Sequence, residues 1–166
     1  MPFVQPIRRL ILLVHILSSI GWIGAIAAFL ALALTGLTAT NLSIVRATYI
    51  AIEPITRWII VPLAFASFVT GLLLSLGTPW GLLRHYWVIF KLLINLLSLP
   101  ILLLHTRIID RVAAAATISN LAPADLRPDR IQLVVASSAS LAVLIIATLL
   151  SVYKPRGLTS WGYSRQ

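Results

Sequence analysis

Four long apolar runs, separated by short polar segments, dominate the pattern of this chain. A helix needs about 20 apolar residues to cross a hydrocarbon core about 30 Å thick. The runs therefore predict four membrane-spanning helices, at about residues 10–35, 58–76, 86–106 and 131–153. We expect an all-α, integral membrane four-helix bundle with up-down topology. Residues 1–166 would form a single transmembrane domain, with both termini on the same side.

The first run is interpreted as a retained span, because it exceeds the 7 to 15 residues or so of a signal-peptide core. Helical spacing places several of its polar and bulky residues on one face, namely His15, Ser18, Ser19, Trp22, Ile26 and Phe29. Small residues form a strip beside this face, at Gly21, Ala25 and Ala28. Such a strip favours the close approach of another helix.

The third run carries a polar stripe. At about 100° per residue, one narrow sector of its helix contains Arg84, Trp87, Lys91, Asn95, Ser98, Leu102 and His105. A cation in hydrocarbon costs about 3 kcal/mol or more, so we expect this stripe to face protein or trapped water. Pro100 lies within the run and predicts a kink.

The segments between the runs are more polar. We interpret residues 38–57 as a loop with an amphipathic lead-in at the interface, where Glu53 can pair with Arg57 four residues later. Residues 107–120 are expected to extend the third helix into water. Three aspartates are expected in a water-facing loop, Asp110, Asp125 and Asp129.

The composition fits a membrane protein, because 60% of the residues are hydrophobic and only 10% are charged, against about 25% in soluble domains. The net charge is +9, and the 13 Lys and Arg residues lie mainly at span ends and in loops. Anionic lipid headgroups are therefore the expected partner, and no nucleic acid is. Six basic residues flank the spans on each side, so the positive-inside rule leaves the orientation open. The absence of cysteine excludes disulfides, iron–sulfur clusters and thiolate zinc sites.

Candidate chemistry centres on His15 and Lys91. His15 is six residues beyond Arg9, and Lys91 is seven beyond Arg84, which places both about 10 Å deep on parallel spans. They can therefore meet in one layer of a bundle. Trp22 and Trp87 are expected to flank that layer, and Asn95 adds hydrogen-bonding groups.

Such a layer fits haem b or a related tetrapyrrole, because a neutral imidazole ligates iron and cations hold the propionates. His15 is the expected metal ligand, and Arg84, His85 and Lys91 are placed to bind the propionates. The alternative interpretation is structural: His15 and Lys91 hydrogen-bond Ser, Asn and backbone groups, with Lys91 reaching toward the interface. His85 and His105 are about 30 Å apart on one helix, so they cannot share a metal.

Four motifs carry a resemblance to a family of small four-span bacterial integral membrane proteins with no assigned activity. The family patterns are LHxxxxxxWxG, GTPWGLxRHYWVxxKLL, a helix-ending LLH and VYKPxGxTxxG. Here they correspond to Val14–His15 with Trp22–Gly24, and to residues 77–93, 103–105 and 152–162. The resemblance implies a multi-pass protein of the bacterial inner membrane.

The chain also distantly resembles HemJ-type protoporphyrinogen oxidases and CopD-like copper-resistance membrane proteins. The HemJ pattern maps onto His15, Trp22, Trp87, Lys91 and His105. This resemblance implies that His15 is the haem ligand and Lys91 an essential polar partner, and that any enzymatic activity is that of a haem-dependent membrane oxidoreductase. The chain departs from the pattern after Trp22, where AIAAFLALALT lacks the expected Tyr and Arg.

Two other classes of function stay open. A non-catalytic scaffold, homo-oligomer or subunit of a larger membrane complex would use the small-residue faces of the first and fourth runs. In the fourth run these residues are Ala136, Ser137, Ser138, Ala139 and Ser140. Copper handling is less favoured, because Cu(I) prefers thiolates and thioethers, and the chain has no Cys and no Met after Met1.

Overall fold

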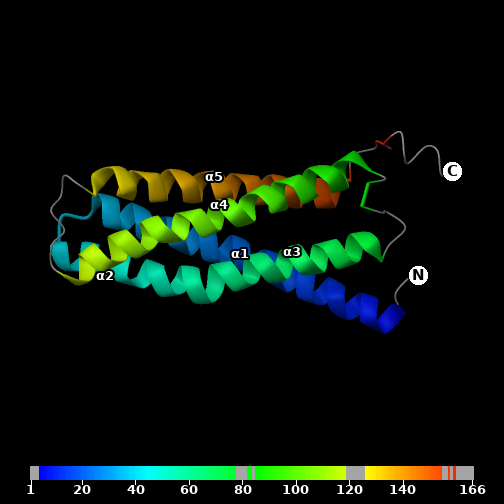
Figure 1. Ribbon diagram of the computed structural model, residues 1–166, viewed down its shortest axis with the longest axis horizontal. Helices are drawn as coiled ribbons and strands as arrows, with labels where there is room; N and C mark the ends of the chain where they lie inside the picture. Colours follow the sequence, from blue (N-terminus) through cyan, green and yellow to red (C-terminus); the bar gives the residue numbers. More distant parts are fainter. Residues whose placement is uncertain are drawn as a thin grey trace.

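The computed structural model describes residues 4–77, 82–83, 85–118, 126–154, 157 and 159. Its elements are α1 (Gln5–Thr38), α2 (Leu42–Ile55), the π-helix η1 (Thr56–Ile60), α3 (Val61–Leu76), α4 (Tyr86–Thr117) and α5 (Arg127–Tyr153). Because α2, η1 and α3 follow one another without a break, they form one long helix (Figure 1). The structure thus has four helices that are long and apolar enough to cross a membrane. The predicted all-α four-helix bundle is confirmed.

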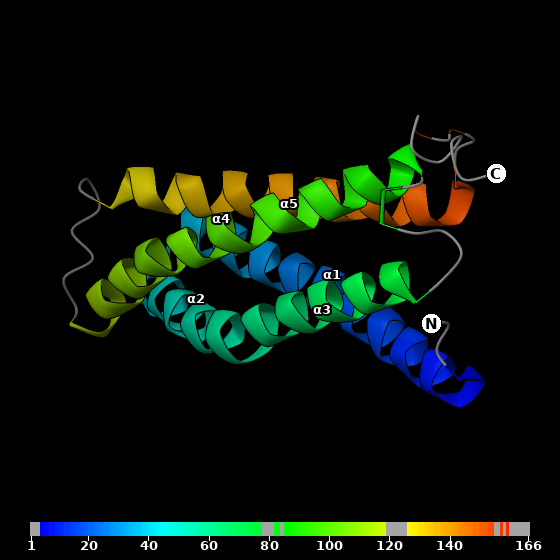
Figure 2. The same cartoon turned by 45° about the vertical axis from the view of Figure 1, so that its right-hand side comes forward.

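Successive long helices run in opposite directions, so both ends of the chain lie at one end of the bundle (Figure 1). We call this the terminal end. Helix α1 packs against α3 and α5, and α4 packs against α2, α5 and α3. The first turns of α1 diverge from α4 and α5, which Figure 2 shows from a second direction. The bundle is therefore more open at the terminal end.

The apolar core lies mainly away from the terminal end. On α1 the buried residues are Ser18, Trp22, Ile26, Phe29, Ala33 and Gly36, which follow the helical face that the sequence predicts. Of the predicted small-residue strip, Gly21 faces Leu63 of α3 and Ala25 packs against the core, whereas Ala28 is exposed. The strip thus serves helix packing at two of its three positions, and Gly21 does so against α3.

Of the expected loop with an amphipathic lead-in at residues 38–57, the loop covers only residues 39–41. The amphipathic part forms α2, which buries one face, and the start of η1. Asn41 caps α2 by accepting a hydrogen bond from the backbone N–H of Ser43 at 2.9 Å. Tyr49 and Ile52 are each only 1% exposed, so α2 is part of the core. The helix continues past Pro54 although an internal proline costs about 3 kcal/mol. Burial of the α2 face favours this continuation, and η1 follows the proline.

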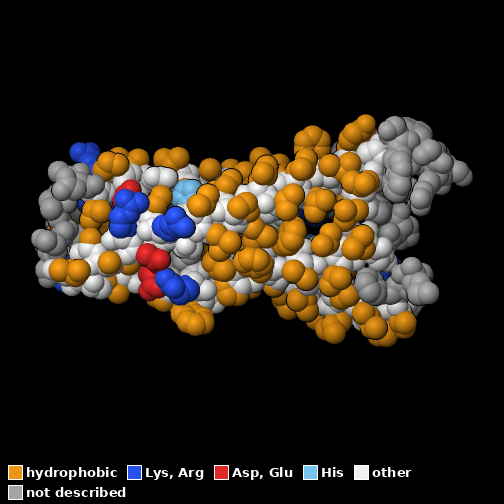
Figure 3. Space-filling view, in the orientation of Figure 1, with side chains coloured by type: hydrophobic (Ala, Val, Ile, Leu, Met, Phe, Trp, Pro, Cys, Tyr) orange, Lys and Arg blue, Asp and Glu red, His pale blue; other side chains and the backbone are white. Residues whose placement is uncertain are grey.

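The four long helices contain 34, 35, 32 and 27 residues. At about 1.5 Å per residue they span about 40 to 52 Å, which exceeds the hydrocarbon core of about 30 Å. Charged side chains gather opposite the terminal end (Figure 3), where the surplus length can lie in water. We call this the charged end, and its charged residues include Arg46, Glu53, Arg57, Arg107, Asp110, Arg111, Asp129 and Arg130. Trp58 beside Arg57 is 76% exposed, a position that suits an aromatic anchor at the membrane interface.

Ion pairs join helices at the charged end. Arg57 contacts Glu53 at 2.9 Å, which confirms the predicted pair, and it also contacts Asp110 of α4 at 2.9 Å. Arg111 of α4 pairs with Asp129 of α5 at 3.4 Å. Asp110 and Asp129 are both helical, so their predicted place in a loop is wrong; Asp125 lies outside the described residues.

Candidate functional site

A cavity of about 420 Å³ opens at the terminal end, between α1, α3, α4 and α5. Its polar and aromatic lining residues are Arg8, His15, Ser67, Phe68, Ser75, Trp87, Lys91, Asn95, Ser151 and Lys154. We call it the His15 cavity. It brings together His15 of α1 with Trp87, Lys91 and Asn95 of α4, as their matched depths predict.

His15 is held by α3. Its Nδ1 lies 3.1 Å from the carbonyl oxygen of Ser67 and 3.1 Å from the hydroxyl oxygen of Thr70. The Thr70 hydroxyl donates its own proton to the carbonyl of Ala66 at 2.5 Å, and a carbonyl only accepts. We therefore assign the imidazole proton to Nδ1. This assignment leaves Nε2 as the nitrogen with a lone pair, the form in which histidine binds metals.

The packing of α1 against α3 accounts for the position of the imidazole. A Cβ on Gly71 would lie 3.0 Å from Cε1 of His15, so the absence of a side chain lets the ring lie against α3. Ser19 and Ser67 join the same two helices through their hydroxyls at 2.8 Å. His15 is thus held in place by hydrogen bonds between α1 and α3, within a contact that is otherwise apolar.

Lys91 reaches α5 and lies in a positively charged environment. Its Nζ donates to the hydroxyl oxygen of Ser151 at 2.5 Å, and that hydroxyl donates to the carbonyl of Ala147 at 2.9 Å. Arg8 and Lys154 add two further cations to the lining, which contains no carboxylate. The carboxylates of the described residues lie at the charged end. The His15 cavity therefore favours an anionic group.

Asn95 is already engaged on its own helix, because its Nδ2 donates to the carbonyl of Lys91 at 2.8 Å. Its amide oxygen and the second proton of Nδ2 are left for a ligand. Trp87 lines the cavity, and its ring centroid lies 6.3 Å from that of His85. His85 itself is the N-cap residue of α4 and is not among the lining residues.

Besides His85, the predicted site residue Trp22 is also outside this group. Trp22 does not flank the His15 layer: it is seven residues, or about 10 Å, further along α1 and lines a second cavity together with His105. The sequence predicted its helix face correctly but not its layer. Arg84 lies outside the described residues.

Sequence reasoning missed the residues that hold the two key side chains, namely Ser67 and Thr70 for His15 and Ser151 for Lys91. The available signal was weak. Ser67, Thr70 and Gly71 recur at spacings of three and four, which places them on one face of α3. Which neighbouring helix meets that face depends on the packing of the whole bundle.

The chain matches no family model, no curated protein and no solved structure. The resemblance to the four-span bacterial family, to HemJ-type oxidases and to CopD-like proteins therefore gains no support from these comparisons and stays a prediction. Four membrane-compatible helices identify the chain as an integral, multi-pass membrane protein.

Proposed function

We propose that this membrane protein binds haem b or a related tetrapyrrole in the His15 cavity, where Nε2 of His15 would bind the iron. The observation that carries the proposal is the hydrogen bond from Nδ1 of His15 to the Ser67 carbonyl at 3.1 Å. Metal-binding histidines commonly donate their other ring N–H to a carbonyl or carboxylate, which fixes the ring and increases its basicity.

The remaining lining fits the other parts of such a ligand. Haem is a flat apolar ring with two carboxylates, and the cavity combines apolar walls with Arg8, Lys91 and Lys154. Lys91 would bind a propionate through a charge-assisted hydrogen bond. Bound haem would supply one-electron redox chemistry, while the protein binds it, orients it and limits the access of water.

The test is the absorption spectrum of the full-length protein, purified in detergent after expression with ample haem and recorded oxidised and then reduced. The wild-type protein should show a Soret band that shifts on reduction. His15→Ala should lose the band, because it removes the ligand. A colourless wild-type protein would overturn the proposal.

His105→Ala and His85→Ala are the matched controls. His105 lies in the other half of the bundle, and His85 lies outside the cavity lining, so both variants should keep the Soret band. If His15→Ala keeps the band at full intensity while one of these variants loses it, the axial ligand has been assigned to the wrong histidine.

No observation favours copper handling as a second candidate. Within the described ranges, no three His, Cys, Asp or Glu side chains come together as a metal site. Nor does a scaffold role have specific support, because part of the small-residue face of α5 lines a cavity within the chain.

A further inference from the structure

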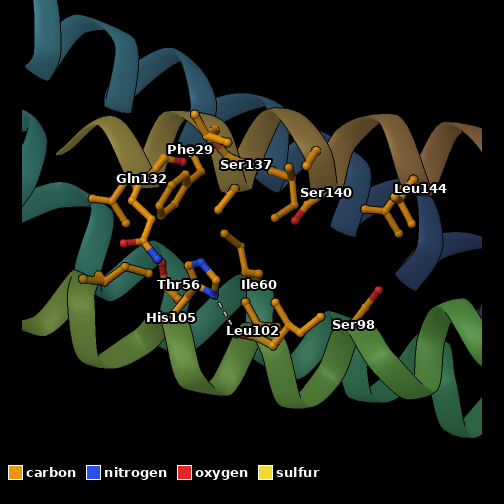
Figure 4. Close-up of a pocket in the computed structure, with 18 of the residues that line it drawn as sticks. Phe29, Thr56, Ile60, Ser98, Leu102, His105, Gln132, Ser137, Ser140 and Leu144 are labelled. Atoms are coloured by element: carbon orange, nitrogen blue, oxygen red, sulfur yellow. Dashed lines mark hydrogen bonds between the residues drawn. The ribbon is translucent and has the colours of Figure 1, made fainter. Parts of the chain in front are cut away.

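A second cavity of about 410 Å³ lies in the half of the bundle nearer the charged end (Figure 4). All four long helices contribute to its lining, and α4 and α5 form two facing walls. We call it the α4–α5 cavity. It shares no lining residue with the His15 cavity, and its volume is in the range of small-molecule sites.

The walls of the α4–α5 cavity are mostly apolar, and none of its lining residues is Lys, Arg, Asp or Glu. The wall that α5 forms has small side chains, which leave space for a ligand: Ala136, Ser137, Ala139 and Ser140. Ala139 and Ser140 are exposed, as is Ile101 on the facing wall. The cavity can therefore be reached from the bilayer between α4 and α5, and it suits an uncharged molecule.

Trp22 lines this cavity and is only 4% exposed. Its indole N–H is fully buried and has no acceptor among the described residues. A buried donor without a partner costs about 1 to 3 kcal/mol, so native structures rarely leave one unsatisfied. The indole N–H of Trp22 is therefore an unsatisfied donor within the wall, behind the surface of the cavity.

Two serine hydroxyls that line the cavity also lack a hydrogen-bond partner among the described residues. Ser137 and Ser151 of α5 donate to carbonyls one turn back, as serine in a helix commonly does. Ser98 and Ser140 make no such bond within the described part of the chain, and Figure 4 shows both reaching into the space between α4 and α5. They are further donors that face a cavity rather than their own helix.

His105 marks one end of the cavity. Its Nδ1 lies 2.8 Å from the carbonyl of Ile101, so this nitrogen carries the proton. Figure 4 shows the ring beside Thr56 and facing Gln132. Polar groups therefore gather at this end, while Leu102 and Leu144 provide apolar walls further along.

We infer that the α4–α5 cavity binds the uncharged, apolar part of a molecule that enters from the bilayer and presents carbonyl oxygens to Ser98 and Ser140. Two sources offer this chemistry: a membrane quinone, and the ester group of a bilayer lipid. The inference is independent of haem binding, because it concerns a separate cavity.

The test uses the full-length protein in detergent and a short-tailed benzoquinone as the probe, with Tm recorded against quinone concentration. Binding to the folded state raises Tm in a saturable way. Ser140→Phe fills the cavity and should weaken binding by about tenfold or more, roughly the effect of losing 1.4 kcal/mol. Ser138→Phe is the matched control, because Ser138 is exposed on the same helix and is not among the lining residues. It should bind as the wild-type protein does.

A second variant, which only removes hydroxyl groups, tests the inference in case Ser140→Phe does not fold. Ser98→Ala combined with Ser140→Ala keeps the cavity open and should weaken binding by about thirtyfold, as expected for two lost hydrogen bonds of about 1 kcal/mol each. Far-ultraviolet circular dichroism checks the helix content of each variant.

Mass spectrometry of the purified protein distinguishes the lipid source. One phospholipid per chain, retained by the wild-type protein and by Ser138→Phe but lost from Ser140→Phe, would identify a lipid as the occupant even if the quinone does not bind. The inference is overturned if the quinone shows no saturable binding and no such phospholipid is retained. It is also overturned if folded Ser140→Phe binds the same molecule as tightly as the wild-type protein.

Discussion

Arg130 on α5 donates from Nε to the hydroxyl oxygen of Tyr49 on α2 at 2.9 Å, and its guanidinium carbon lies 5.3 Å from the centre of the same ring. Arg130 also donates to the carbonyl of Gly36, near the end of α1. A cation is favourable there, because the last carbonyls of a helix carry partial negative charge. One side chain thus joins three helices close to the charged end.

Tyr49→Phe should destabilise the protein by about 1 to 2 kcal/mol, because it removes the acceptor of a partly buried, charged donor while keeping the ring. The measurement is the unfolding midpoint in detergent. Tyr153→Phe is the control, because Tyr153 is 78% exposed and should leave the midpoint unchanged. Equal shifts for the two variants would show that Arg130 does not depend on the Tyr49 hydroxyl.

Gly36→Ala should be among the most damaging small substitutions. An added Cβ would lie 2.6 Å from Cζ of Tyr49 and 2.9 Å from the hydroxyl oxygen of Thr48, so α1 and α2 must separate. Overpacking of this kind costs about 1 to 3 kcal/mol or more. Gly24→Ala is the matched control on the same helix, because nothing lies within 4 Å of its added Cβ. It should leave Tm unchanged or raise it, and a comparable loss in both variants would contradict the close packing at Gly36.

The sequence could predict features that depend on periodicity alone. The buried face of α1, from Ser18 to Phe29, follows from helical spacing, and so does the inward-facing stripe of α4. The stripe does divide between two cavities: Trp87, Lys91 and Asn95 line one, and Ser98, Leu102 and His105 line the other. Counting residues from the flanking arginines correctly placed His15 and Lys91 in one layer.

Features that depend on tertiary packing could not be predicted in this way. The polar residues and Pro54 in residues 38–57 indicated a loop with an amphipathic lead-in, but burial of Tyr49 and Ile52 holds residues 42–57 in one continuous helix. Trp22 shares a face with His15, yet its depth places it in a different cavity. Ser67 and Ser151 became partners of His15 and Lys91 through the relative rotation of the helices, which no spacing within one helix reveals.

Arg46→Ala should loosen the last turn of α4. Arg46 donates from α2 to the carbonyls of Ala116 at 2.9 Å and Thr117 at 3.3 Å, which have no later helical N–H to bind. We expect amide hydrogen exchange in residues 112–118 to become about fivefold faster, corresponding to about 1 kcal/mol of lost protection. Arg107→Ala is the control, because it removes an exposed arginine of α4 itself. Equal acceleration in both variants would attribute the effect to net charge rather than to these hydrogen bonds.

Lys91→Met should stabilise the ligand-free protein and weaken the proposed haem binding. Lys91 is a partly buried cation, and the lining of the His15 cavity contains no carboxylate within the described part of the chain. Burying a charge without a counter-charge is unfavourable. Methionine has a similar length, and the Ser151 hydroxyl keeps its bond to the carbonyl of Ala147. We expect a higher Tm without ligand, by the equivalent of about 1 kcal/mol or more, together with an affinity for haem reduced by about tenfold.

Ser151→Ala completes a double-mutant cycle on the same contact. In the wild-type background it removes the acceptor that lies 2.5 Å from Nζ of Lys91 and should destabilise the protein by about 1 to 3 kcal/mol. In the Lys91→Met background the same change should cost less than about 0.5 kcal/mol, because no buried ammonium is left without its partner. Equal costs in the two backgrounds would mean that Ser151 acts through its own helix alone. The unfavourable burial of Lys91 would then be offset by groups other than this hydroxyl.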